Sequence, residues 1–330
     1  MPSSGPGPEA LTWDVVVVGA GPAGAATALT LAGFGRRVLL VERGTTARFK
    51  LGESLPPVST DLVEHFLGDI EGPGWSPGGH YRTAGNLSLW AAGPPDVTDF
   101  YFTPTGFGLC VDRLAFDEAL RKAAVAAGAT LRTGCRLEAC ERIADRSANW
   151  RLTLASDPGA SRHLARYVVD CSGRRAVLAT VLGVPTVAHD RLFAYARWFS
   201  REGADDDRHT RVEAASGGWW YSNRLPGAEG GETRRLVVFH TDRDLPEARS
   251  AGHPEGFERL LDASTLMAPL LRDGGYRPCG AIRGRPPGAN ACGNSVARPG
   301  WPSGTRRRPT TRCRPRASTR RSGRAATPGT

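Results

Sequence analysis

Three glycines near the start of the chain, Gly19, Gly21 and Gly24, have a spacing that can bring a phosphate-bearing ligand close to the backbone. The first permits a tight turn, the second lets a pyrophosphate approach, and the third lets a helix pack against a strand. Glu42 follows 18 residues after Gly24, where a carboxylate can accept hydrogen bonds from ribose hydroxyls. This pattern predicts a dinucleotide site, and the acid at Glu42 favours FAD or NAD over NADP.

The surrounding sequence supplies the elements that such a site requires. Val15–Val18 form an apolar run typical of a buried strand, and a helix of small residues is expected over Pro22–Leu31. The partial positive charge at the start of that helix favours an anion. A second strand, Arg37–Val41, leads directly to Glu42. Because strand, turn, helix, strand and acid occur in this order, the glycines predict a nucleotide-binding α/β domain and not a simple glycine-rich turn.

Segments further along resemble flavin-dependent tryptophan-halogenase-like proteins and their monooxygenase relatives. They are FKLGESLPP at 49–57, AGNLSLW at 84–90, the stretch 99–124, VVDCSGRRAVLA at 168–179 and GGWWYSNRLPG at 217–227. Among those relatives, the chain is most similar to the flavoproteins that help mature tryptophan-derived quinone cofactors. The resemblance covers residues 12 to about 240, and it implies FAD as the cofactor.

The motif and the resemblance together imply a set of cofactor contacts. Arg113 stands at the start of an amphipathic segment, and its planar guanidinium suits phosphate oxygens; the alternative is a surface arginine neutralised by Asp112 or Asp117. A buried strand ends at Asp170 and turns at Gly173, which the family places beside the dinucleotide; a plain strand exit is the alternative. The expected cofactor-binding residues are Gly19, Gly21, Pro22, Ala23, Gly24, Glu42, Arg43, Gly52, Ser54, Arg113, Asp170 and Gly173.

The rest of the chain predicts a second, mostly antiparallel sheet. Residues 130–171 have the pattern of a strand meander, and further strands are expected at about 192–200, 209–221 and 234–241. The predicted fold class is α/β (α+β), a Rossmann-like FAD-binding domain with an antiparallel substrate domain, as in flavin hydroxylases. The expected division is 12–75 and 100–190 for FAD, 76–99 and 191–272 for substrate, a return segment at 273–301, and a tail at 302–330.

The resemblance leaves a choice of reaction, and the residues favour oxygenation. Flavin halogenases use a lysine between flavin and substrate, but the chain's two lysines, Lys50 and Lys122, stand at other positions. Aligned on Pro226, the two tryptophans of the halogenase motif fall on Tyr221 and Asn223. We therefore predict a monooxygenase that acts on an aromatic or indole-like group through a flavin hydroperoxide. A halogenase and a flavoprotein maturation partner for a quinone-cofactor protein are the alternatives.

Four residues are candidates for the chemistry itself. Glu53 and His80 could act as acid or base, although polar residues beside glycine turns also serve loop geometry. Trp219 and Trp220, together with Tyr221, could line an aromatic pocket, and core and sheet packing is the alternative for each. The substrate would be a small aromatic molecule or a peptide or protein. Electrons would come from NAD(P)H or from a separate flavin reductase.

Composition excludes several other classes of protein. The formal net charge is +10, but residues 302–330 contribute nine arginines and no acid, which leaves 34 basic and 33 acidic residues before them. The body is thus nearly neutral and gives no nucleic-acid footprint. Seven cysteines without a CxxC pair favour reduced thiols over disulfides or a metal site. No apolar run reaches membrane-spanning length and no signal peptide is evident, so a cytoplasmic location is expected.

The arginine-rich ending is best explained as translation out of frame. The family carries a second cofactor motif near its C-terminus, a Gly-Asp followed by small residues, which is missing after Trp301. Read one base earlier, the codons for residues 302–327 can give AVGDAAAAYDPLSSQGIHAALRSGRD, which contains that motif. A basic arm for nucleic acid is the alternative, but no aromatic residues interleave its arginines. We predict that residues 302–330 lack stable structure and that losing the motif leaves the flavin site open on one side.

Overall fold

The computed structural model describes residues 11–45, 50–69, 79–143, 148–188, 190–227, 231–286 and 290–292. All of them belong to one compact unit, residues 1–293. The segment 302–330, which we predict to be out of frame and unstructured, lies outside the described residues, as does most of the expected return segment after residue 286.

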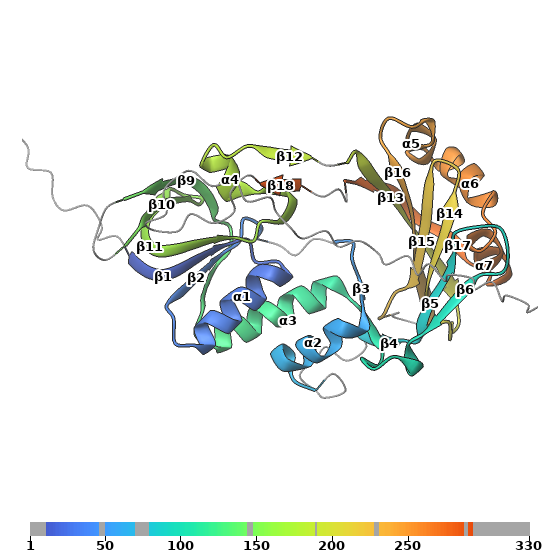
Figure 1. Ribbon diagram of the computed structural model, residues 1–330, viewed down its shortest axis with the longest axis horizontal. Helices are drawn as coiled ribbons and strands as arrows, with labels where there is room; N and C mark the ends of the chain where they lie inside the picture. The colour runs from blue at the N-terminus through green and yellow to red at the C-terminus, as the bar shows by residue number, and fades with distance from the viewer. Residues whose placement is uncertain are drawn as a thin grey trace, which may run out of the picture. The chain divides into compact units, whose positions relative to one another are not determined.

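A six-stranded sheet carries the nucleotide motif (Figure 1). Its order is β8 (Thr130–Arg132), β2 (Val38–Val41), β1 (Leu11–Val18), β11 (Ala160–Asp170), β10 (Trp150–Ala155) and β9 (Arg136–Arg142). The first four strands run parallel, whereas β10 and β9 add in antiparallel fashion. The parallel part places the carboxyl ends of β1 and β2, with Gly19 and Glu42, at one edge of the sheet.

Alternating valines in β1 explain how this sheet is covered. Val15 and Val17 pack in a core with helices α1 (Pro22–Gly33) and α3 (Arg113–Ala126). Val16 and Val18 point to the other face, where they pack with residues of β9 and β10 and with the short helix α4 (Val177–Val181). The helix α3 begins at Arg113 because the Asp112 carboxylate accepts hydrogen bonds from the backbone N–H groups of residues 114 and 115.

The second sheet has seven strands (Figure 1). Its order is β17 (Arg277–Arg285), β13 (Leu192–Glu202), β16 (Glu232–Asp242), β15 (Gly218–Arg224), β14 (His209–Ala215), β5 (Gly85–Leu89) and β6 (Asp96–Asp99). All neighbours pair antiparallel except β14 and β5. The predicted fold class, a Rossmann-like domain with a mostly antiparallel second sheet, is therefore confirmed.

The two faces of this sheet differ in what covers them. One face packs against helices α5 (Pro246–Ala251), α6 (Pro254–Asp262) and α7 (Met267–Asp273) through a core that includes Trp220, Phe239 and Phe257. The other face carries Ala194, Ala196, Leu236 and Val238, with the larger Trp198 and Tyr221 beside them. The two alanines leave room above part of this face, which we call the small-residue face, so a ligand could lie there.

Smaller elements complete the described chain. A three-stranded sheet of β3 (Ser54–Leu55), β7 (Gly108–Val111) and β4 (His80–Thr83) lies beside helix α2 (Thr60–Leu67), and β12 (Thr186–Ala188) pairs with β18 (Asn290–Cys292). Single turns of helix occur at Pro57–Ser59 (η1), Phe100–Phe102 (η2) and Gly173–Arg175 (η3). No helix in the described ranges is long and apolar enough to span a membrane.

The predicted elements differ from the observed ones in three places. The segment 209–221 forms two strands, β14 and β15, because Gly217 adopts φ of 69° and turns the chain. The first segment of the predicted meander, 130–143, is likewise divided, since β8 joins the parallel sheet beside β2 and only β9 pairs with β10. Strand β17 pairs with β13 inside the range expected to be a return segment. The domain boundaries themselves stay a prediction.

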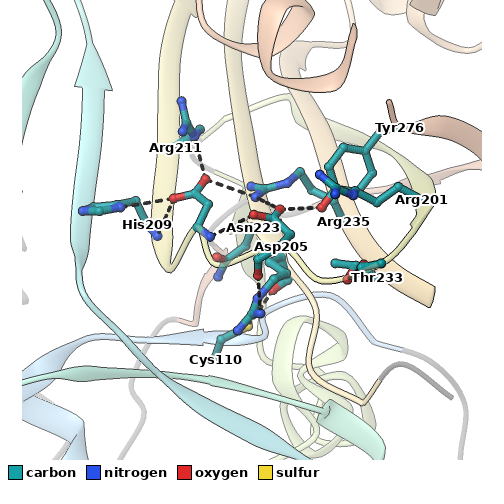
Figure 2. Close-up of polar contacts among 12 residues, drawn as sticks. Cys110, Arg201, Asp205, His209, Arg211, Asn223, Thr233, Arg235 and Tyr276 are labelled. Atoms are coloured by element: carbon teal, nitrogen blue, oxygen red, sulfur yellow. Dashed lines mark hydrogen bonds and ion pairs between the residues drawn. The ribbon is translucent and has the colours of Figure 1, made fainter. Parts of the chain in front are cut away.

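A cluster of buried charges holds the loop between β13 and β14 to the second sheet (Figure 2). The Arg235 guanidinium, which is fully buried, donates from Nη2 to the carboxylates of Asp205 (2.7 Å) and Asp207 (3.1 Å). Tyr276 donates its hydroxyl to Asp205 at 2.5 Å, and Arg211 Nε donates to Asp207 at 3.0 Å. Burial alone would raise the pKa of both aspartates, but these partners outweigh it and lower both pKa values.

Replacing Arg235 with methionine should lower the free energy of unfolding by about 3 to 5 kcal/mol at neutral pH, because two largely buried carboxylates lose the fully buried cation that they share. The two aspartates with Arg235 stabilise the fold fully above the unfolded-state aspartate pKa of about 3.9. This stabilisation is lost as the pH falls through the lower pKa values of the aspartates in the folded state. The difference in unfolding free energy between the wild type and Arg235→Met, measured by urea denaturation, should therefore shrink below about pH 4. Arg211→Met, a more exposed arginine with a single carboxylate partner, should cost about 1 kcal/mol or less; equal losses would contradict this account.

Candidate active site

The glycine loop has the close contacts that its spacing predicts. Gly19 adopts φ of 102°, and a Cβ there would lie 2.5 Å from the Cys171 carbonyl oxygen. A Cβ on Gly24 would lie 1.8 Å from the Gly19 carbonyl oxygen. By contrast, no atom lies within 4 Å of a Cβ built on Gly21. Two of the glycines therefore allow close packing inside the protein, whereas Gly21 leaves open space above the start of α1.

Glu42 lies at the same edge of the sheet, directly after β2. Its Oε2 accepts a hydrogen bond from the Ala20 amide (3.0 Å) and its Oε1 accepts one from the Gly44 amide (2.9 Å). Burial opposes ionisation, but these hydrogen bonds and the positive charges of Arg121 and Lys50 outweigh it and lower the pKa of Glu42. The carboxylate is therefore ionised at neutral pH, and oxygens held in this way can also accept from sugar hydroxyls.

A cavity of about 910 Å³ extends from this loop to the small-residue face of the second sheet, and we call it the central cavity. Its size is at the upper end of the range of about 300 to 1,000 Å³ for ligand sites. Eleven predicted residues line it: Gly19, Gly21, Pro22, Ala23, Glu42, Arg43, Gly52, Ser54, Arg113 and Gly173 from the cofactor set, and Glu53 from the catalytic set. The structure thus brings together side chains that lie far apart in the sequence.

Arg113 supports the loop beside the cavity. Its Nη1 donates to the carbonyl oxygens of Leu51 (2.8 Å) and Gly52 (3.1 Å), and its Nε donates to Asp117 at 3.2 Å. Lys50 pairs with the same aspartate at 2.9 Å. Arg113 was predicted either to contact the cofactor or to be neutralised by Asp112 or Asp117. It is paired with Asp117 and also lines the cavity, so the two roles do not exclude each other.

Two other members of the predicted cofactor set lie behind the cavity surface. Gly24 makes the close contact of α1 with Gly19. Asp170 shapes the next turn, since its carboxylate accepts hydrogen bonds from the Ser172 amide at 3.0 Å and from the Leu178 amide at 2.8 Å. Gly173 follows with φ of 66° and lines the cavity.

A buried carboxylate, Glu53, and a partly buried tyrosine, Tyr221, form a pair in the cavity wall. The Tyr221 hydroxyl donates to Glu53 Oε1 at 2.6 Å, and the Gly52 amide donates to Oε2 at 3.1 Å. Glu53 is only 3% exposed. Burial, together with the negative charge of Glu53, raises the pKa of Tyr221 well above its usual value, so the phenol keeps its proton.

The remaining catalytic candidates lie elsewhere. His80 is the first residue of β4 and is not among the residues that line the central cavity. Trp220 is fully buried on the helix-covered face of the second sheet, against Phe239 and Phe257. Trp219 lies on the cavity side of β15 and stacks on His240, with ring centroids 5.0 Å apart. Core packing, the alternative given for Trp220, therefore describes its position.

The cavity residues outside the predicted set include His240 and Arg285, and the pairing of Tyr221 with Glu53 was also not predicted. All three are on strands of the second sheet, and their meeting depends on strand register. Within the described ranges, no group of three or more His, Cys, Asp or Glu side chains is arranged to hold a metal ion.

Proteins of similar sequence include FAD-dependent oxidoreductases. Residues 14–192 match the family model of FAD-dependent oxidoreductases. The chain is 30% identical over 263 residues to the FAD-dependent oxidoreductase LodB of Marinomonas mediterranea, which covers 79% of this chain and 69% of LodB.

Solved structures share the fold. The myxobacterial chondrochloren halogenase CndH has a TM-score of 0.69 and 23% identity, with 86% of this chain and 65% of that chain covered. Aklavinone-11 hydroxylase, solved with FAD and aklavinone, has a TM-score of 0.63 and 20% identity, with 86% and 55% covered. This chain therefore spans less than two thirds of either protein.

Proposed function

The chain belongs to the family of FAD-dependent oxidoreductases, and on that premise we propose that it is a monooxygenase acting on an aromatic, indole-like group. One observation carries the proposal. The central cavity is continuous from the glycine loop to the small-residue face of the second sheet, and the Glu53–Tyr221 pair lies in its wall. A bound dinucleotide and a bound ring could therefore meet in one continuous space.

The residues present fit FAD. Open space above Gly21 and the free amides at the start of α1 suit a pyrophosphate, and the ionised Glu42 suits a ribose. We propose that Gly19, Gly21, Pro22 and Ala23 hold the pyrophosphate, with Arg43, Gly52 and Ser54 close to the rest of the cofactor. When bound and reduced, FAD supplies the electrons that activate dioxygen.

The chain's own residues would orient the substrate and handle protons. Ala194, Leu236 and Val238 give the cavity an apolar floor that can take an aromatic ring and exclude water. Tyr221 fixes the Glu53 carboxylate by its short hydrogen bond. We propose that Glu53 takes up the proton that the ring releases on oxygenation and that Tyr221 is its positioning residue. The reductant proposed is NAD(P)H, used directly or through a separate flavin reductase.

The exposed aromatic side chains bear on whether the substrate is small. Trp90, Tyr101 and Phe102 are 60%, 71% and 81% exposed on and near the β5–β6 hairpin. None of them is among the residues that line the central cavity. A patch beside the cavity would favour a protein or peptide substrate, as a maturation partner requires. We therefore propose a small aromatic molecule first and a protein side chain second.

Halogenation is the competing reaction, and the contacts of the two lysines bear on the choice between it and oxygenation. The Lys50 ammonium pairs with Asp117 at 2.9 Å, and Lys122 is exposed on α3. Lys50 lines the central cavity, but its ammonium is paired with Asp117 and not with Glu53 or Tyr221 in the described structure. Incubation with reduced FAD, dioxygen, bromide and an indole compound should give an oxygenated and not a brominated product by mass spectrometry. A brominated product would show that the halogenase alternative is right.

A further inference from the structure

One row of side chains crosses the second sheet at the edge of the central cavity. Ala194 on β13 is paired with Arg285 on β17 on one side and with His240 on β16 on the other, and Trp219 on β15 is paired with His240. Directly opposed residues of antiparallel strands point to the same face. Arg285, Ala194 and His240 all line the cavity, so this row forms one end of its floor.

His240 is fixed and uncharged. Its ring stacks on Trp219 with an interplanar angle of 6°. Its Nδ1 is buried and has no hydrogen-bond partner among the described residues, and burial lowers the pKa of His240 to about 4. A buried N–H without an acceptor is less well tolerated than an unpaired acceptor. The neutral ring should therefore carry its hydrogen on Nε2, which leaves Nε2 as the donor available to a ligand.

Arg285 presents its guanidinium at the cavity edge. The residue is exposed, and no hydrogen bond or ion pair joins its side chain to any residue that the structure describes. Arg283 is two residues earlier on the same strand and points to the same face, but its guanidinium lies 5.6 Å from the Trp198 ring centroid and it does not line the cavity. Between Arg285 and His240 stands only the methyl group of Ala194. An N–H donor and a guanidinium therefore flank a small residue with space above it.

We propose that Arg285 and His240 bind a carboxylate of the aromatic substrate, which makes the substrate class an aromatic acid. This rests on the proposed function. A guanidinium recognises a carboxylate through two parallel N–H donors, and the His240 Nε2–H supplies a third. The next row of the same face holds Val238, paired with Tyr221. It lies about 7 Å further along the strand, which is the reach of a short linker between a carboxylate and a ring. The ring is thereby placed next to the Glu53–Tyr221 pair.

The test compares indolepropionate with indolepropionamide, which has the same shape without the charge, by equilibrium dialysis against the FAD-loaded full chain. The acid should bind about tenfold or more tighter than the amide. Arg285→Gln should remove that preference and leave FAD affinity unchanged, whereas the matched Arg283→Gln should keep it. The proposal is wrong if the wild type binds the two probes equally or does not measurably bind the acid. It is also wrong if Arg283→Gln loses the preference for the acid.

Two further outcomes separate the possible sources of failure. If Arg285→Gln weakens FAD binding tenfold or more, the arginine serves the cofactor's phosphates and the proposal is wrong. If the protein binds the acid more tightly than the amide but never oxygenates it, the proposed monooxygenase function is wrong and the proposed carboxylate site stands. A chain that binds and oxygenates both probes equally well would defeat only the carboxylate site.

Discussion

Replacing Gly24 with alanine should abolish FAD binding. The new Cβ would lie 1.8 Å from the Gly19 carbonyl oxygen, a separation that non-bonded atoms cannot adopt, so α1 would have to move away from the turn. That shift would displace the amides of the glycine loop from the pyrophosphate position. We expect the affinity for FAD to fall about a hundredfold or more, because several charge-assisted hydrogen bonds are lost together. Flavin absorbance that remains with the protein after gel filtration measures the effect.

Gly33→Ala is the matched control in the same helix. No atom lies within 4 Å of a Cβ built on Gly33, so the substitution meets open space. Alanine is the better helix former, and the variant should keep wild-type FAD content and gain up to about 1 kcal/mol of stability. A Gly24→Ala protein that retains as much FAD as the Gly33→Ala protein would show that the turn does not hold the cofactor.

Glu53→Gln should lower the turnover number about a hundredfold or more while FAD binding stays unchanged. The amide preserves the shape of the side chain and can still meet the Tyr221 hydroxyl, but it cannot take up a proton. Tyr221→Phe should lose less, about tenfold, because it removes only the 2.6 Å hydrogen bond that positions the carboxylate.

The control for the tyrosine is Tyr81→Phe. Tyr81 is also a partly buried tyrosine whose hydroxyl donates to the second sheet, to the Arg224 carbonyl oxygen at 2.7 Å and to Asn223 at 3.2 Å, but it does not line the central cavity. Its variant should keep the wild-type turnover number and pH profile. A Glu53→Gln enzyme with full turnover, or equal losses in the two tyrosine variants, would show that the pair has a structural role only.

The nucleotide half of the site could be predicted because it is encoded locally. Gly19, Gly21 and Gly24 lie within six residues, and the strands and helix around them follow from apolar runs next to them. Glu42 also follows, since the end of the second parallel strand must lie beside the end of the first. No long-range pairing had to be known in advance.

The substrate half could not be predicted, because it depends on strand register. Glu53 and Tyr221 are 168 residues apart and meet only through the packing of the second sheet against the 51–54 loop. Treating 209–221 as one strand also hid the turn at Gly217, after which alternation puts Trp220 in the helix-covered core and Tyr221 in the cavity. His240 and Arg285 share a row only because both strands flank β13.

The source of the oxygen in the product tests the central claim most directly. The full chain is supplied with reduced FAD, heavy-isotope dioxygen, ordinary water, bromide and indolepropionate. The mass of the product is then measured by mass spectrometry. A monooxygenase incorporates one oxygen atom from dioxygen into the ring. We predict a product that carries one heavy oxygen atom and no bromine, with the yield strongly reduced in Glu53→Gln. A brominated ring, or an oxygen atom that comes from water, would contradict the account.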